Sequence, residues 1–565
     1  MNNLIKKLTN DRKTVISVMI IASLFFVAPL MHTHVIFASD DLIYHINRIQ
    51  ELTINLKKGN WYPYLYSYRF HDVPFLLGSF YPQLTLLPFA VFSLITKNYV
   101  VGIYLGISLY TFIAMLVMFY IGKQLKRSSS EALILSLVYA FSACRTYNIF
   151  SRFALGEYLG MTFTPLALYG LYAIVKGNKN GWKCLGLGLS FVLLSHVLST
   201  FLCVMVLCIE LIILALTIKK VAWRSVVIDL TKSVGLFIAS SLIFLVPFLE
   251  QMMSYKIAQP SPMNLLEYSP TVAELFNNSI SNNLISGYIM GTGLSQGMGI
   301  GILYVIAAVW GGAKFKDLDV ISRYSLVLGI AILLATSKLF PWSTLMATPI
   351  KVIQIPTRLI PFATIFLSVV VAKMLVVFAR SSTKKAIAAS MIVIVVSVPW
   401  LGSIQNFHSQ MNGRWDNFYN NRVYTSNNAQ KDASFWYLDQ YIPQNSSKYL
   451  TKITNHIATI NSRSVHLKEM SALPNGMSYK DTKLNGARNV VLPVVNYKNI
   501  EVVQGNKVLP HKDRSGLIFL KRTQNGPLKI QYIPSLLDRL AMVVSIVTWG
   551  SFLLMGIYGF IKKVR

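Results

Sequence analysis

Near the start of the chain, two adjacent carboxylates are followed at helical spacing by a histidine and an arginine. The four residues are Asp40, Asp41, His45 and Arg48. On a helix, Asp41, His45 and Arg48 share one face at i, i+4 and i+7. A carboxylate there can take a proton from an attacking hydroxyl or hold a divalent cation such as Mg²⁺ or Mn²⁺, and an arginine can neutralise a phosphate leaving group. A solvated amphipathic helix would show the same spacing, so the motif alone leaves both interpretations open.

Further polar residues stand beside later apolar runs. They are Arg145, Arg152, Glu157, His196, Glu250, Gln354 and Arg358. Arginine and glutamate at helix ends often cap the helix or reach toward the interface, and a histidine at a helix junction can be structural. In the topology that the basic clusters indicate, however, all of them lie on the same side of the membrane. This convergence favours one shared site.

The segment after the first motif alternates aromatic and charged residues. It contains Trp61-Tyr62-Pro63-Tyr64 and Tyr68-Arg69-Phe70-His71-Asp72. For the aromatic residues, an interfacial belt is favoured over sugar stacking. Asp40 and Asp41 are thus the candidate catalytic residues and also the candidate metal ligands. The candidate substrate-binding residues are His45, Arg48, Arg69, His71, Arg152, Glu157, His196, Gln354 and Arg358.

The composition points to lipid as the main solvent of the chain. Of its 565 residues, 54% are hydrophobic and 13% are charged, and the mean hydropathy is +0.50. The formal charge of +31 is gathered in short clusters between apolar runs, as topology signals are, which argues against nucleic-acid binding. Glu210 lies in mid-span, where an ionised carboxylate costs roughly 3 kcal/mol, so we expect it to be hydrogen-bonded.

Apolar runs near the ~20 residues that a bilayer demands divide the chain. They cover residues 15–37, 100–122, 131–147, 159–176, 184–199, 200–218, 233–250, 298–312, 321–337, 358–380, 386–402 and 537–561. The first run is interpreted as an uncleaved anchor. Six basic clusters agree on a multi-pass membrane protein with both termini in the cytoplasm. Tyr81–Thr96 resists a full crossing and is predicted to be re-entrant or interfacial, which gives about 12–14 transmembrane helices.

Residues 403–536 differ in character from the rest. Strand-like runs occur at 489–495, 500–503, 517–520 and 528–532, and a helix is predicted around 432–438. We therefore expect a transmembrane domain over 1–402 with a catalytic outer loop at 38–80, an extracytoplasmic β-rich domain over 403–536, and a last helix with its tail over 537–565. The β-rich segment carries 17 Lys and Arg against 7 Asp and Glu, which favours an anionic partner or lipid headgroups.

These motifs, in this order, resemble the YfhO-type bacterial membrane proteins of the GT-C superfamily of polyprenyl-phosphate-sugar-dependent glycosyltransferases. The matching pieces are Asp40-Asp41 with His45 and Arg48, Phe80-Tyr81-Pro82, Arg152 to Glu157 with Pro165 and Gly170, Ser195-His196, Gln354-Ile355-Pro356-Thr357-Arg358, Leu492-Pro493 to Tyr497, Val502 to Gly505, and Tyr532. Ile355 stands where the family has an aromatic residue, and the tryptophan expected after Tyr532 is absent.

The resemblance implies a GT-C-like polytopic α-helical fold and transfer of a sugar from a polyprenyl-phosphate carrier, with inversion, on the outer face. Asp40 or Asp41 would be the general base, and Arg152, Arg358 or His196 would stabilise the departing phosphate. The implied acceptor is an anionic envelope polymer such as teichoic acid, or a glycolipid. Two alternatives stay open: a transporter or flippase of lipid-linked saccharides, and a noncatalytic envelope-assembly protein.

Overall fold

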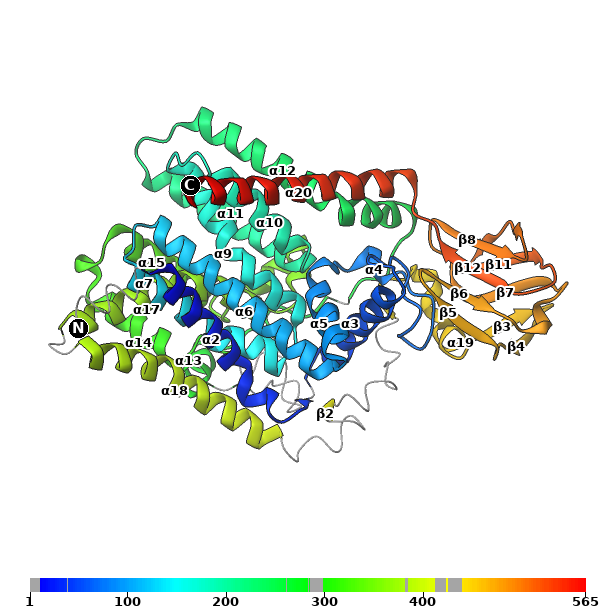
Figure 1. Cartoon of the computed structure of the whole chain (residues 1–565), viewed down its shortest axis with the longest axis horizontal. Coiled ribbons are helices and arrows are strands. Elements are labelled where there is room, and N and C mark those ends of the chain that lie inside the picture. The colour runs from blue at the N-terminus through cyan, green and yellow to red at the C-terminus, as the bar shows by residue number, and fades with distance from the viewer. Residues whose placement is uncertain are drawn as a thin grey trace.

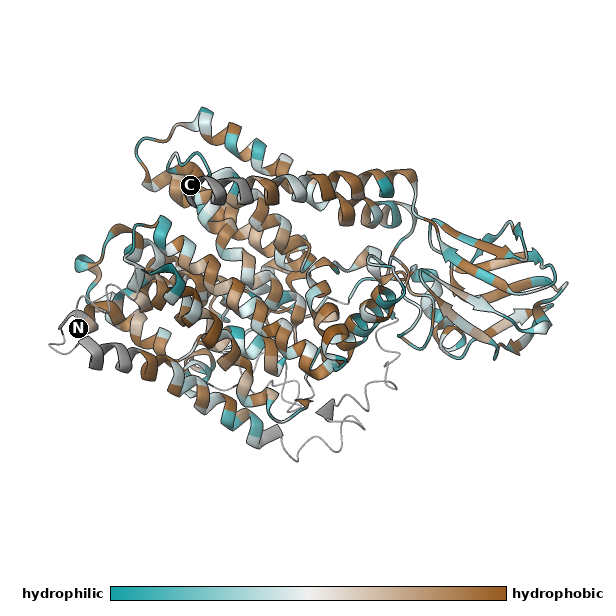
Figure 2. Ribbon diagram, in the orientation of Figure 1, coloured by the Kyte–Doolittle hydropathy of each residue, from teal (hydrophilic) through white to brown (hydrophobic). Residues whose placement is uncertain are grey.

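The computed structural model describes residues 11–37, 39–260, 262–282, 284, 298–381, 385–411, 423–424 and 439–564. In these ranges the chain forms a body of long helices with a β-rich domain at one end (Figure 1). Hydrophobic residues cover the helices, whereas hydrophilic residues are frequent on the strands and loops of the β-rich domain (Figure 2). The helix predicted around 432–438 lies outside the described residues.

Eight helical segments among the described residues are long and apolar enough to cross a membrane. They are α2 (Arg12–Met31), α6 (Tyr99–Gln124), the run Ser129–Ser151 formed by α7 (Ser129–Ala140), α8 (Ala143–Thr146) and a π turn (Tyr147–Ser151), α9 (Leu155–Val175), α11 (Val197–Thr217), α12 (Trp223–Ser254), α17 (Ile360–Ser381) with the 3₁₀ turn before it, and α20 (Leu536–Val564). The remaining predicted spans coincide with α10 (Gly181–Leu193), α14 (Ile302–Ala313), α15 (Val320–Ala335) and α18 (Lys385–Met411). The predicted polytopic helical fold is confirmed.

Small residues allow α9 and α10 to pack with their backbones close together. A Cβ atom on Gly170 would lie 2.3 Å from the backbone nitrogen of Leu185, and one on Gly188 would lie 2.6 Å from that of Ala167. Such close approach is how membrane helices gain packing energy without a hydrophobic driving force. Glycine is therefore required at both positions, and α9 is fixed against its neighbour.

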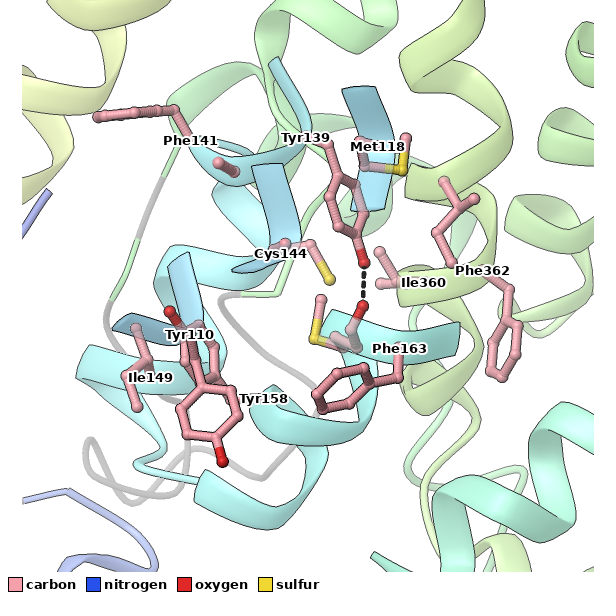
Figure 3. Close-up of a cluster of buried hydrophobic side chains, with 14 of the residues drawn as sticks. Tyr110, Met118, Tyr139, Phe141, Cys144, Ile149, Tyr158, Phe163, Ile360 and Phe362 are labelled. Atoms are coloured by element: carbon pink, nitrogen blue, oxygen red, sulfur yellow. Dashed lines mark hydrogen bonds between the residues drawn. The ribbon is translucent and has the colours of Figure 1, made fainter. Parts of the chain in front are cut away.

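Tyrosines fill the interior between α7 and α9. The Tyr139 hydroxyl donates a 2.6 Å hydrogen bond to the carbonyl oxygen of Met161, which is the dashed contact of Figure 3. The Tyr158 hydroxyl lies 2.7 Å from the Thr111 hydroxyl on α6. These two buried phenols thus each have a polar partner, as an interior lacking water favours. Glu210 is likewise hydrogen-bonded, as predicted, because Tyr324 donates to it at 3.3 Å.

The segment that resisted a full crossing forms a short helix, α5 (Leu87–Thr96). Ten helical residues span about 15 Å, half of the ~30 Å hydrocarbon core. The helix ends at Lys97, whose backbone is left-handed (φ 54°), and the chain turns at once into α6. A re-entrant or interfacial element, as predicted, fits these dimensions.

The β-rich domain consists of two five-stranded antiparallel sheets in the orders β10-β11-β7-β3-β4 and β5-β6-β12-β8-β9. The strands are β3 (Ile457–Ile460), β4 (Arg463–His466), β5 (Met470–Leu473), β6 (Gly476–Tyr479), β7 (Arg488–Val495), β8 (Ile500–Gln504), β9 (Lys507–Val508), β10 (Lys512–Arg514), β11 (Leu517–Arg522) and β12 (Leu528–Tyr532). All four strands predicted from sequence are confirmed. Buried residues of both sheets share one core, so the domain is a β-sandwich.

Aromatic residues of segment 38–80, the predicted first outer loop, join the β-sandwich to the helices. The Tyr64 ring stacks on Tyr532 with centroids 5.0 Å apart, and the Asn475 side-chain oxygen accepts hydrogen bonds from the backbone nitrogens of Tyr64 and Leu65. Tyr64 and Leu65 are fully buried in the core that includes the sandwich. The predicted interfacial belt is therefore wrong for Tyr64, because the adjoining sandwich covers its ring.

The C-terminal end of α12 also contacts the sandwich. Gln251 and Lys498 exchange two hydrogen bonds through the glutamine side chain and the lysine backbone. The Glu250 carboxylate accepts from Asn499 and from Ser535, the residue before α20. The sandwich is thus fixed to both the first outer loop and the end of α12.

Candidate active site

The helix predicted after the carboxylate pair is α3 (Leu42–Lys57), and it is buried along nearly its whole length. Interpretation of this motif as a solvated amphipathic helix is wrong, because α5 and the first outer loop cover it. Asp41 occupies the N-cap position, yet its side chain makes no capping hydrogen bond. The Asp41 carboxylate is therefore not used for capping and is free to act beside the N-terminus of α3.

The backbone of the motif is attached to the turn that precedes α9. The Asp41 backbone nitrogen donates to the Arg152 carbonyl oxygen at 2.9 Å, and the Nε of Arg152 lies 3.9 Å from a carboxylate oxygen of Asp40. Phe153, the next residue, adopts a left-handed backbone (φ 48°). This reversal after the π turn directs Arg152 toward the start of α3.

Glu157, on the first turn of α9, joins two arginines that are distant in sequence. Arg152 donates to Glu157 at 2.8 Å, and the Nε of Arg358 donates to it at 2.6 Å. All three side chains are at most 13% exposed. Arg152 also lies beside Asp40, whereas Glu157 is the one carboxylate that pairs with Arg358 among the described residues, so Arg358 is the guanidinium group better placed to bind a ligand anion.

Arg358 is oriented by the turn that brings it to the cluster. Its Nη1 donates to the Gln354 side-chain oxygen at 2.6 Å and to the Ile353 carbonyl oxygen at 2.9 Å. Gln354 itself has a left-handed backbone (φ 64°), and Ile355 is buried. Residues Gln354 to Arg358 thus form a turn that fixes the position of the Arg358 guanidinium group.

A second group of side chains lies on the other side of the start of α3. The Arg48 guanidinium sits 4.0 Å from the centre of the Tyr81 ring, donates to the carbonyl oxygens of Tyr81 and Pro82 and lies 3.4 Å from His45 Nδ1. The Tyr81 ring in turn contacts His196, with centroids 5.8 Å apart. Arg48 therefore serves the Tyr81-Pro82 turn through three separate contacts.

His196 caps α11 with its own ring. Its Nδ1 accepts from the Ser199 backbone nitrogen at 3.3 Å, so the neutral ring carries its proton on Nε2. A Cβ atom on Gly156 would lie 3.1 Å from this ring and 2.5 Å from the Tyr81 hydroxyl. Glycine at 156 lets the ring and the phenol approach Glu157.

A small pocket opens at Glu157, Arg358 and His196. Its other walls are Ser199 and Thr164, and the apolar side chains of Met161, Leu202, Pro361 and Phe362. One end of the pocket is therefore charged and the other is hydrocarbon. This combination suits an amphiphile with an anionic head.

Burial shifts the pKa values of the aspartate and of the two histidines beside the pocket in opposite directions. Burial raises the pKa of Asp41, and Arg152 and Arg358 oppose this change. Burial lowers the pKa of His45 far below its usual range and that of His196 to about 4. Both imidazoles are thus neutral near pH 7, and Asp41 is the group whose pKa moves toward the working range of a general base.

The donor set does not fit a divalent cation. Asp40 and Asp41 supply two carboxylates, but Arg152 and Arg358 occupy their surroundings. No group of three or more His, Cys, Asp or Glu side chains suited to a metal occurs among the described residues. A hard cation needs several oxygen ligands and is repelled by adjacent guanidinium groups.

No family model and no curated protein matches the chain. Among solved structures it is similar to a cryo-EM structure of the arabinofuranosyltransferase AftD from Mycobacteria, at 16% sequence identity and a TM-score of 0.40. The match covers 70% of this chain and 27% of that chain, so it spans about a quarter of the length of AftD.

Nine of the eleven candidate residues come together, and two lie elsewhere. Those near the start of α3 are Asp40, Asp41, His45, Arg48, Arg152, Glu157, His196, Gln354 and Arg358. Arg69 instead acts on Tyr99 at the start of α6, and the backbone of His71 meets His456 of the sandwich. Their loop carries the left-handed residues Phe70, His71 and Asp72 in succession, which turns it toward the sandwich.

Sequence reasoning missed Tyr441. This residue precedes the first strand of the sandwich by 16 positions, yet its phenol lies in the field of Asp41, Arg48 and Arg358. Its ring contacts Phe80 at 6.0 Å and Tyr81 at 6.3 Å. An isolated tyrosine in a polar connection carries no local signal, so only the fold identifies it.

Proposed function

We propose that the chain is a membrane glycosyltransferase of the GT-C type that moves a sugar from a polyprenyl-phosphate carrier to a cell-envelope acceptor on the extracytoplasmic face. The observation that carries the proposal is the uncapped carboxylate of Asp41 beside two arginines that share Glu157. The catalytic loop of this proposal is residues 38–80, and the β-sandwich of strands β3 to β12, within the domain predicted over 403–536, is its acceptor-side domain.

The pocket supports a lipid-phosphate donor. Arg358 and the Nε2–H of His196 are available at its charged end, while Met161, Leu202 and Phe362 offer an apolar wall to a prenyl chain. A diester phosphate placed there accepts hydrogen bonds from these two groups. Hydrogen bonds from guanidinium to phosphate are short and strong in a poorly hydrated site.

The reaction then needs one proton transfer and one displacement. Asp41 takes the proton of an acceptor hydroxyl while that oxygen attacks the anomeric carbon from the face opposite the phosphate. The bond between the anomeric carbon and the phosphate oxygen breaks, and its electron pair leaves with the phosphate, which Arg358 and Arg152 stabilise. The product sugar has inverted configuration, and the proton remains on Asp41 until solvent removes it.

The sandwich supports an anionic acceptor. Residues 439–535 hold 14 Lys and Arg against 5 Asp and Glu, and no ion pair within 4.0 Å involves this domain in the described part of the chain. Strand alternation puts Lys512, Arg514 and Lys521 on one exposed face of the first sheet. The Arg514 guanidinium lies 5.3 Å from the Phe519 ring on that face. A polymer bearing phosphates, such as a teichoic acid, complements this surface.

The test is sugar transfer by purified protein in liposomes, from a radiolabelled polyprenyl-phosphate sugar to envelope polymer. Asp41→Asn is expected to abolish transfer, and Asp40→Asn to reduce it less, because Asp40 is the carboxylate nearer Arg152. Asp317→Asn is the matched control, since that carboxylate is 72% exposed and remote from the cluster. Equal transfer by the Asp41→Asn variant and wild type would exclude Asp41 as the base. If both Asp variants move a lipid-linked saccharide across the bilayer as fast as wild type does, and no sugar transfer is detected, the result would favour a flippase.

A further inference from the structure

Tyr441 is attached by backbone pairing to the segment that follows α12. Its nitrogen donates to the Ala258 carbonyl oxygen at 2.9 Å, and the Ala258 nitrogen donates to Ile442 at 2.7 Å. The next contact, between the Gln444 nitrogen and Lys256, measures 2.8 Å. We name residues 439–449 the strap. Three backbone hydrogen bonds thus fix the strap where it passes the site.

The backbone of Tyr441 is in the left-handed region, with φ 60°. This conformation is unfavourable for a bulky aromatic residue, and glycine or asparagine would adopt it more easily. A tyrosine in such a place indicates that its side chain is needed there. Its carbonyl oxygen accepts a 3.4 Å hydrogen bond from the Tyr497 hydroxyl of the sandwich, which helps to hold the turn.

The side chain completes an aromatic wall made of Phe80, Tyr81 and Tyr441. The Tyr441 ring lies nearly parallel to Phe80, at an interplanar angle of 23°, and perpendicular to Tyr81, at 85°. Tyr81 is held from its other face by Arg48. Flat apolar ring faces bordered by polar groups suit the faces of sugar rings, whose C–H and O–H groups alternate.

The phenol lies among the charged groups of the site. Its electrostatic neighbours are Arg48, Asp41 and Arg358. Burial raises the pKa of Tyr441 to about 12, so the hydroxyl keeps its proton at neutral pH. It is therefore a hydrogen-bond donor close to the proposed base, on the side of the site that faces the sandwich.

We propose that Tyr441 positions the acceptor, with its hydroxyl donating a hydrogen bond to the acceptor glycan or polyol so that the attacking oxygen faces Asp41. This inference rests on the proposed transferase function and adds an acceptor subsite to it. The acceptor side of the site is then built by the strap and the sandwich, and the donor side by the pocket of Glu157 and Arg358.

Steady-state transfer by the Tyr441→Phe variant tests this assignment. The substitution removes one hydroxyl and keeps the ring contacts with Phe80 and Tyr81. We expect the acceptor KM to rise about five- to tenfold, the effect of one lost hydrogen bond, while the donor KM and the slow hydrolysis of donor without acceptor stay unchanged. Tyr449→Phe, in the same strap, is the matched control and should behave as wild type. Tyr441→Ala should weaken acceptor binding further.

A purely structural role for Tyr441 predicts a different pattern. Kinetics of Tyr441→Phe equal to wild type would overturn the inference, and so would an equal loss of donor hydrolysis and transfer. In either result wild-type transfer remains, so the proposed function itself survives. Absence of transfer in wild type with every polyprenyl-phosphate donor would instead refute the proposed function.

Discussion

The Nε of Arg358 donates a 2.6 Å hydrogen bond to Glu157 across 201 positions of sequence. The same carboxylate accepts from Arg152, five residues before it. Glu157 thus brings the turn before α17 to the turn before α9, and both turns to the start of α3. The geometry of the candidate site depends on this one carboxylate.

Removal of that charge should affect stability and activity together. Glu157→Gln removes the carboxylate that two guanidinium groups share and leaves Arg358 without its ion-pair partner, so we expect the free energy of unfolding to fall by about 3 kcal/mol and transfer to drop strongly. Thermal unfolding in detergent and liposome transfer measure the two effects. Glu210→Gln is the control, because its partner Tyr324 can still donate to the amide oxygen. A Glu157→Gln variant with wild-type transfer would contradict the role of the cluster.

The acid side of the pH profile should report Asp41. Its pKa is raised by burial, and the base acts when deprotonated, so transfer should decline as pH falls through that raised pKa. Arg358 lowers this pKa, and the Arg358→Gln variant should therefore show the decline at higher pH as well as slower transfer. An acid limb at the same pH in both proteins would assign the limb to another group.

The raised pKa of Asp41 also predicts how this residue affects the stability of the protein at different pH values. A carboxyl group with a raised native pKa binds its proton in the folded state where the unfolded chain has lost it, so its contribution to stability falls as pH rises from ~3.9 to the native pKa. Asp41→Asn should accordingly have a Tm at pH 7 equal to or above that of wild type while transfer is lost. A clearly lower Tm would point to a structural role. Calorimetry of both proteins at pH 5 and pH 7 measures the difference.

Gly156 and Gly160 provide a matched pair on α9. A Cβ atom at 156 would lie 2.5 Å from the Tyr81 hydroxyl, whereas one at 160 would lie 3.2 Å from the nearest atom, on Ser199. Alanine favours the helix equally at both places. We expect Gly156→Ala to lower transfer about tenfold by displacing Tyr81 and His196, and Gly160→Ala to retain most of it. Equal activity of the two variants would contradict the importance of this approach.

Asn475 should contribute to the attachment of the sandwich to the helices. Its side-chain oxygen accepts from two buried backbone nitrogens, of Tyr64 and Leu65, and its backbone is left-handed (φ 55°). Asn475→Gly keeps the backbone conformation, removes both hydrogen bonds and should cost about 2 kcal/mol of stability. Asn489→Gly, also left-handed (φ 45°) but exposed, should change little. Limited proteolysis and thermal unfolding can compare the two.

Periodicity and hydropathy located the spans and strands correctly because both signals are local. Residues 489–495 and 528–532 read as strands and form strands, and the motif Asp41, His45 and Arg48 lies at the start of a helix. These local signals do not, however, determine which residues distant in sequence a side chain contacts. The sequence pattern treated Arg69 and His71 as equal to Arg48, whereas three successive left-handed residues turn their loop away.

Burial was the second quantity that the sequence did not show. Arg145 was expected at an outer helix end, but its side chain is completely buried, with Tyr158 and Tyr139 rings 4.4 Å and 5.3 Å from its guanidinium carbon. The position of Tyr441 depends on pairing with Ala258, which is remote in sequence. Contacts of this kind are set by tertiary packing, on which residue spacing has no bearing.

The last helix, α20, has a consequence for protein engineering. Its membrane window is only 11% buried, and its specific polar contacts to α12 include Ser545 with Ala239 and Ile243, and Trp549 with Ser240. Most of its surface therefore meets lipid, and its sequence there is free to vary within hydrophobic residues. An unrelated apolar helix that carries Ser545 and Trp549 should anchor the β-sandwich equally well. The β-sandwich and α20 could therefore be exchanged together, as one unit, between related chains.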